Sequence, residues 1–118
     1  MSEAIDGKED PVLTALESLV SDLERNVEAS RLAIERAAKI AELRQEGRPY
    51  REIVDETGRP LVVELINENM ERLRSSGAAL RHAQATALHD EGMTMEQIAE
   101  VYGVTRQRIS AILRGRRP

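Results

Sequence analysis

The sequence predicts an all-α protein, and three of its features support that fold class. The 118-residue chain contains no Trp, no Phe and only two Tyr, so its core must be built from Leu, Ile, Val and Ala, which suits helices packed on helices. A pattern of apolar residues at helical spacing runs without Gly or Pro from residue 12 to residue 46. Beyond it, Gly and Pro divide the chain into shorter helical stretches. We therefore expect about six helices, with a long N-terminal helix followed by a helical bundle that ends in a three-helix unit.

The N-terminal part of the chain divides into a tail and the long helix. Residues 1–11, MSEAIDGKEDP, are predicted to be a disordered acidic tail, and Pro11 is well placed to open a helix. In residues 12–46, small or apolar side chains recur at alternating steps of three and four. β-Branched residues fill one set of these positions and leucines the other in the first half, which favours a two-stranded coiled coil. This predicted seam consists of Leu13, Leu16, Val20, Leu23, Val27, Ser30, Ile34, Ala37 and Ala41.

The first half of the predicted seam is expected to form the interface of a homodimer. The side chains of this interface are Leu13, Leu16, Val20, Leu23 and Val27. The second half, from Ile34 to Leu43, is expected to lie on the body of the protein. The alternative is a long helix folded back in a monomeric bundle, because further apolar residues widen the stripe beyond a strict seam. These are Val12, Leu19, Ala33 and Ile40.

The C-terminal part, residues 78–118, contains the most specific local pattern. A helix is predicted from Ala78 to Glu91, and MTMEQIAEVYGVTRQRISAILR then predicts two short helices joined by a tight turn. Thr94 and Gln97 have the spacing of a capping box, Gly103 suits a left-handed corner, and Thr105 can cap the second helix. Ala99 would let the two helices approach closely. The side chains expected to fill the angle between them are Ile98, Val104, Ile109 and Ile112.

This pattern resembles the helix-turn-helix motif of bacterial DNA-binding proteins, and GVTRQRIS is similar to the homeodomain-like motifs of sigma factor region four and resolvases. The resemblance implies that the helix over residues 104–114 enters the major groove of duplex DNA. Arg106 would then pair with guanine, Gln107 with adenine, and Ser110 would reach a neighbouring base. Arg108 could contact either a base or a phosphate. Phosphate contacts are implied for Thr94, through its backbone amide, and for Thr105, Arg114, Arg116 and Arg117.

The charge distribution is compatible with this implication although the whole chain carries a net charge of −4. Residues 101–118 contain five arginines and no acidic residue, which leaves −9 for the remainder. Exposed charges are screened within about 10 Å at ordinary salt, so local charge decides whether phosphates can approach. The acidic remainder should weaken non-specific DNA binding.

A weak internal repeat suggests that residues 47–77 form a degenerate second helix-turn-helix-like unit. ELRQEGRPYREIVDETG aligns with ALHDEGMTMEQIAEVYG at an offset of 45 residues. The first copy predicts a short helix between Arg48 and Gly58, and then a helix from Leu61 to Arg74 that ends at Ser75-Ser76-Gly77. Glu64, Glu68 and Glu71 would repel phosphate, which favours a structural or protein-contact role for this unit.

Several classes of protein are not expected from this sequence. No apolar run is long enough for a membrane span, and the N-terminus lacks a signal-peptide pattern, so we expect a cytoplasmic, nucleoid-associated protein without a membrane partner. The chain has no cysteine, and His82 and His89 lie seven residues apart, too far for a shared metal without other ligands. With no nucleophile motif and no phosphate-binding glycine loop, neither an enzyme nor a cofactor is expected.

The function predicted from these features is that of a dimeric, sequence-specific regulator of transcription that binds duplex DNA. One alternative is an adaptor that binds RNA polymerase, a sigma factor or another regulator through its acidic helices. The other is an architectural DNA binder of low specificity. The DNA-reading function needs the face of Arg106, Gln107 and Ser110 to be free, whereas the adaptor needs the stripe from Leu13 to Val27.

Overall fold

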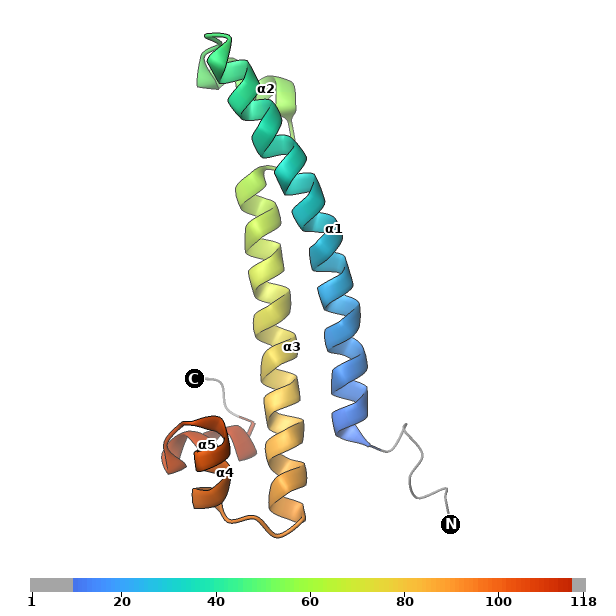
Figure 1. Ribbon diagram of the computed structural model, residues 1–118, viewed down its shortest axis with the longest axis vertical. Helices are drawn as coiled ribbons and strands as arrows, with labels where there is room; N and C mark the ends of the chain where they lie inside the picture. Colours follow the sequence, from blue (N-terminus) through green and yellow to red (C-terminus); the bar gives the residue numbers. More distant parts are fainter. Residues whose placement is uncertain (1–9, 116–118) are drawn as a thin grey trace. The chain divides into compact units, whose positions relative to one another are not determined.

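The computed structural model describes residues 10–115, which contain five α-helices and no strand (Figure 1). The all-α prediction is therefore confirmed. The predicted tail up to residue 9 and the basic residues Arg116 and Arg117 lie outside the described residues. The helices are α1 (Pro11–Gln45), α2 (Tyr50–Thr57), α3 (Val62–Asp90), α4 (Met95–Tyr102) and α5 (Arg106–Leu113).

Helix α3 differs from the prediction, because it is one continuous helix where two were expected. The predicted stop, Ser75-Ser76-Gly77, lies within it. Ser76 is buried, and Gly77 is not among the glycines with a positive φ. A glycine inside a helix costs only about 1 kcal/mol relative to alanine, and packing readily outweighs that cost. The described part of the chain therefore has five helices rather than six.

The chain forms two compact units. The hairpin unit comprises residues 21–73. The terminal unit comprises residues 1–20 and 74–118, of which the structure describes 10–20 and 74–115. Helices α1 and α3 each contribute residues to both units. The two units are considered separately below.

In the hairpin unit, a polar network joins α1 to α3. The side chain of Asn26, which is only 7% exposed, donates to the Asn69 carbonyl (3.0 Å) and accepts from Arg72 Nε (2.7 Å). Arg72 also donates to Asn69 Oδ1 (3.1 Å), and Asn69 Nδ2 donates to Ser30 Oγ (3.1 Å). Residue numbers rise along α1 as those of their partners fall along α3, so these two segments run antiparallel (Figure 1). Such directional bonds fix the register of the pair.

The face of α1 that packs within the hairpin unit is not the predicted seam. The inward-facing positions precede those of the predicted seam by one residue; the buried Asn26 is one of them, and the buried Leu43 continues their spacing beyond the end of the seam. Ile34, expected on the body of the protein, is 69% exposed, whereas Leu43 at the other end of that stretch is buried as expected. The periodicity is the same for both seams, so it cannot distinguish them. The polar network selects the inner one.

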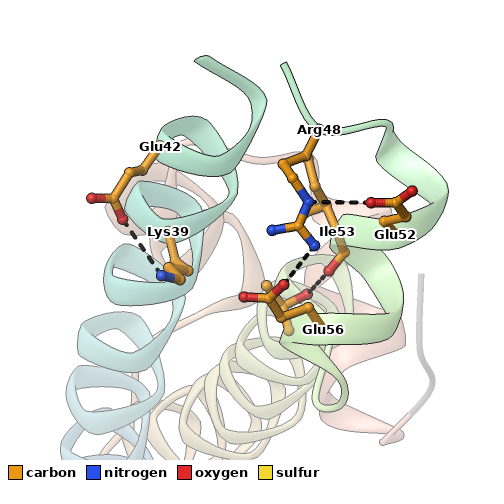
Figure 2. A network of polar contacts seen from close by, with 7 residues as sticks. Lys39, Glu42, Arg48, Glu52, Ile53 and Glu56 are labelled. Carbon is orange, nitrogen blue, oxygen red and sulfur yellow. Dashed lines mark hydrogen bonds and ion pairs between the residues drawn. The ribbon is translucent and has the colours of Figure 1, made fainter. Parts of the chain in front are cut away.

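Helix α2 is held at the end of the hairpin unit by arginines. Arg48 pairs with Glu52 (3.2 Å) and Glu56 (2.7 Å) along α2, as Figure 2 shows. The hydrogen bonds that Arg48 donates to Glu56 and Glu52 raise its pKa, so this side chain stays charged. The guanidinium of Arg36 donates to the carbonyls of Thr57 and Gly58, which lie at the C-terminal end of α2. Arg48 is thus paired with two carboxylates of α2. This pairing favours the structural role expected for residues 47–77.

Replacing Asn26 with alanine is expected to lower the free energy of unfolding by about 1–3 kcal/mol, because the Arg72 guanidinium and the Asn69 carbonyl lose their partner. Urea unfolding followed by far-UV circular dichroism would measure this loss. The matched control is Asn67→Ala, since Asn67 is an exposed asparagine two residues before Asn69 on α3. Equal effects of both substitutions would contradict the structural role of the network.

Candidate nucleic-acid interface

The α4–turn–α5 segment is built from local capping interactions. Thr94 Oγ1 accepts from the Gln97 amide (3.1 Å), and Gln97 Oε1 accepts from the Thr94 amide (2.8 Å), so the predicted capping box is confirmed. Gly103 ends α4 with φ 68° and ψ 35°, the left-handed conformation that glycine adopts without steric cost. Thr105 Oγ1 accepts from the Arg108 amide (3.0 Å) and caps α5. These three signals fix where α4 begins, where it ends and where α5 begins.

A small apolar core lies between α4, α5 and α3. Ile98 and Ile109 are completely buried, as is Ala85 of α3, which the sequence did not single out. Val104, expected to fill the angle between the helices, is instead 38% exposed. It lies in the turn between the two caps, which turns its side chain outward. The residues that complete the core are Ala99, Ile112, Leu88, Met93, Met95, Tyr102 and Leu113.

Two polar contacts attach α4 and α5 to α3. His82 Nδ1 donates to the Ile112 carbonyl in the last turn of α5 (2.7 Å), which gives His82 an interhelical packing role. The Tyr102 hydroxyl donates to Gln84 Oε1 (3.2 Å). Burial raises the pKa of Tyr102, and the nearby Arg81 opposes this only partly, so the neutral phenol is retained. Both contacts hold the outer face of α5 in a defined orientation.

The side chains predicted to contact DNA gather at the beginning of α5. Thr105, Arg106 and Gln107 are exposed there, and Arg108 is half-buried. Arg106 Nε lies 2.9 Å from Glu96 Oε2 of α4, a contact that the sequence did not reveal because it joins two helices. In addition, the helix dipole places a partial positive charge at this end of α5.

The remaining predicted contacts occupy other places. Ser110, one turn further along α5, is half-buried, and its hydroxyl accepts a hydrogen bond from Arg114. Thr94 is exposed, but its backbone amide, predicted to bind a phosphate, donates to Gln97 Oε1. A phosphate at this amide would have to replace that bond.

No feature within residues 10–115 indicates a metal site or a membrane span. The described residues contain no group of three or more His, Cys, Asp or Glu side chains that could hold a metal ion. None of the described helices combines the length and the apolar character needed to cross a bilayer.

Comparison with known families agrees with this geometry. Residues 90–118 match a family model for helix-turn-helix domains, of the Cro/C1 type. The C-terminal segment is a helix-turn-helix domain. The sequence had suggested the sigma factor and resolvase types of this motif, and the feature shared with the matching family is the helix-turn-helix itself. The match supports a DNA-binding protein of the kind that regulates transcription. No curated protein and no solved structure shows a significant match to the chain.

Proposed function

We propose that this protein is a dimeric regulator of transcription that recognises a specific duplex DNA sequence by placing α5 in the major groove. The observation that carries the proposal is the exposed beginning of α5, whose first turn has no acidic residue of its own and where Arg106 and Gln107 extend from a helix that buries Ile109 and Ile112 on its other face. A side chain can discriminate between bases only if its backbone is held in place, and the buried Ile109 and the His82 contact provide that support.

Each of the predicted DNA-contacting side chains has a proposed role. Arg106 pairs with guanine through two hydrogen bonds and Gln107 pairs with adenine, because their donor and acceptor geometries match those base edges. Ser110 reaches a neighbouring base, and Arg108 contacts a base or the backbone. The residues proposed to hold phosphates and set the register are Thr94, Thr105, Arg114, Arg116 and Arg117.

The dimer is proposed because the predicted interface on α1 is uncovered. All five of its side chains are substantially exposed, from 37% for Leu16 to 53% for Val20, with Leu13, Leu23 and Val27 in between. Contiguous exposed apolar residues indicate an interaction surface. A second copy would also raise the affinity for DNA. One helix-turn-helix makes few base contacts, whereas two linked units that bind two half-sites multiply the affinity.

Selection of bound sequences from a random pool of DNA duplexes tests this function. The experiment compares the wild type with the Arg106→Ala/Gln107→Ala double variant, both checked for wild-type helical content. We expect the wild type to enrich a pair of inverted half-sites and the double variant to lose that enrichment.

The other outcomes point to other functions. Binding without sequence enrichment would indicate an architectural DNA binder. No binding at all would overturn the proposal and favour an adaptor, whose partner would be RNA polymerase, a sigma factor or another regulator.

Replacing Glu96 with glutamine is expected to strengthen DNA binding by up to about fivefold. The substitution releases Arg106 from an exposed ion pair worth about 0.2–1 kcal/mol and removes a negative charge near the DNA-facing end of α5. Fluorescence anisotropy with the selected duplex would measure the change. Glu100→Gln is the matched control, because Glu100 is exposed on the same helix. Weaker binding by the Glu96 variant would show that Glu96 positions Arg106 rather than restraining it.

A further inference from the structure

We propose that the dimer interface extends onto α3, so that the hairpin units of two copies pack face to face as a four-helix bundle. This inference deepens the proposed function and depends on its dimeric part. It starts from an exposed apolar stripe on α3. The stripe consists of Val63, Ile66, Met70 and Leu73, all of them at least 42% exposed.

The stripes on α1 and α3 lie on the same side of the hairpin unit. On α1, Leu23 follows the half-buried Asp22 and Val27 follows the buried Asn26, each by one position. On α3, the stripe follows the inward-facing Leu65, Asn69 and Arg72 in the same way. One position along a helix is a rotation of about 100°. Because the two segments run antiparallel (Figure 1), equal rotations turn in opposite senses when both are viewed from one end. Both stripes therefore face the same way.

The two stripes also lie at the same level along the hairpin. Asn26 bonds to Arg72 and Ser30 bonds to Asn69, so α1 residues 23–34 lie beside α3 residues 63–73. Together they form one apolar face that is two helices wide, with side chains spaced by three and four residues. Helices with this spacing pack on one another in four-helix bundles.

The division of polar and apolar residues indicates that this face is covered. Inside the hairpin unit, the contact between α1 and α3 includes Asn26, Asn69 and Arg72, which hydrogen-bond to one another. Leu43, Ile53 and Leu65 supply the apolar part of its interior, whereas a second set of apolar side chains points outward, with Val27 50% and Met70 63% exposed. This outward apolar surface is not buried among the described residues of one chain, and its burial requires an apolar surface on a partner.

A second copy supplies that surface and satisfies the register. The proposed two-fold axis runs parallel to the helices. Each α1 then packs on the α3 of the other copy at the same level along the bundle. In this arrangement Val27 contacts Met70, and Leu23 contacts Leu73, of the second copy. Both copies of α3 then leave the bundle at the Leu73 end, which is the end that continues to the helix-turn-helix. Two linked domains that start from one end suit the half-sites of one operator.

Cross-linking between single cysteines tests this arrangement, because the chain has no cysteine of its own. Val27→Cys and Met70→Cys chains are refolded together and treated with a short bismaleimide. We expect cross-links between the two different chains to predominate. The matched control is Arg25→Cys with Glu68→Cys, since these exposed positions precede the inward-facing residues and lie on the opposite side of the hairpin. This pair is expected to give no cross-link between copies.

Other cross-linking patterns would overturn the proposal. Links only between like cysteines would show a two-fold axis across the helices, with α1 on α1. No link, together with a monomer in sedimentation, would exclude the second copy.

A second variant guards against local effects of cysteine: Met70→Glu should raise the dissociation constant of the dimer at least about tenfold in sedimentation, whereas Glu68→Gln should not change it. A dimer that resists Met70→Glu would confine the interface to α1. DNA selection by a protein that fails these tests would still support the helix-turn-helix function, so the two failures are distinguishable.

Discussion

The Ile98→Ala variant is expected to unfold with a free energy about 2–5 kcal/mol lower than that of the wild type. Ile98 is completely buried between α4, α5 and α3, where it packs with Ala85 and Ile109. Alanine would leave a cavity that these neighbours cannot fill, because caps hold α4 and α5 and the His82 contact joins α5 to α3. The loss is a large share of the 5–15 kcal/mol that stabilises a typical protein.

Urea unfolding would measure this effect as a lower midpoint with an unchanged slope. Val101→Ala is the matched control on the same helix, because Val101 is 62% exposed. Its effect should stay within about 0.5 kcal/mol. If the two variants lost similar stability, the core between the three helices would not be what holds the helix-turn-helix domain together.

The Arg106→Ala variant is expected to lose about 1–3 kcal/mol of affinity for the selected operator, a factor of roughly 5–150. The reason is the loss of the two hydrogen bonds to guanine that are proposed for Arg106. Non-specific DNA, which offers phosphates alone, should bind this variant nearly as well as it binds the wild type. Fluorescence anisotropy at one salt concentration would measure the affinity for the selected duplex and the affinity for a shuffled duplex separately.

Arg116→Ala provides the comparison, since Arg116 is proposed to bind a phosphate. It should weaken binding to both duplexes alike and reduce the slope of affinity against salt by about one charge. If both variants weakened binding to both duplexes equally, the division into a base-reading and a phosphate-binding arginine would be wrong.

The sequence by itself determined the helix-turn-helix. Its signals are short in range, so each can be recognised from a few neighbouring residues. Thr94 and Gln97 cap one helix, Gly103 supplies the left-handed corner, and Thr105 caps the next helix, all as predicted. The burial of Ile98 and Ile109 follows from the periodicity of these two helices.

The tertiary structure decided features that depend on distant residues. Ser76 and Gly77 look like a helix stop when only their neighbours are considered, but their packing allows α3 to continue. The contact of Glu96 with Arg106 joins two helices and leaves no trace in local spacing.

The choice between the two seams of α1 has the same physical origin. Adjacent seams have identical periodicity, and apolar content alone favoured the seam that contains Val27. Asn26 faces inward instead, because Asn69 and Arg72 on α3 satisfy its hydrogen-bonding groups there. The sequence thus determined that α1 has an apolar seam, while the partner residues on α3 decided that this seam stays on the outside of the hairpin unit.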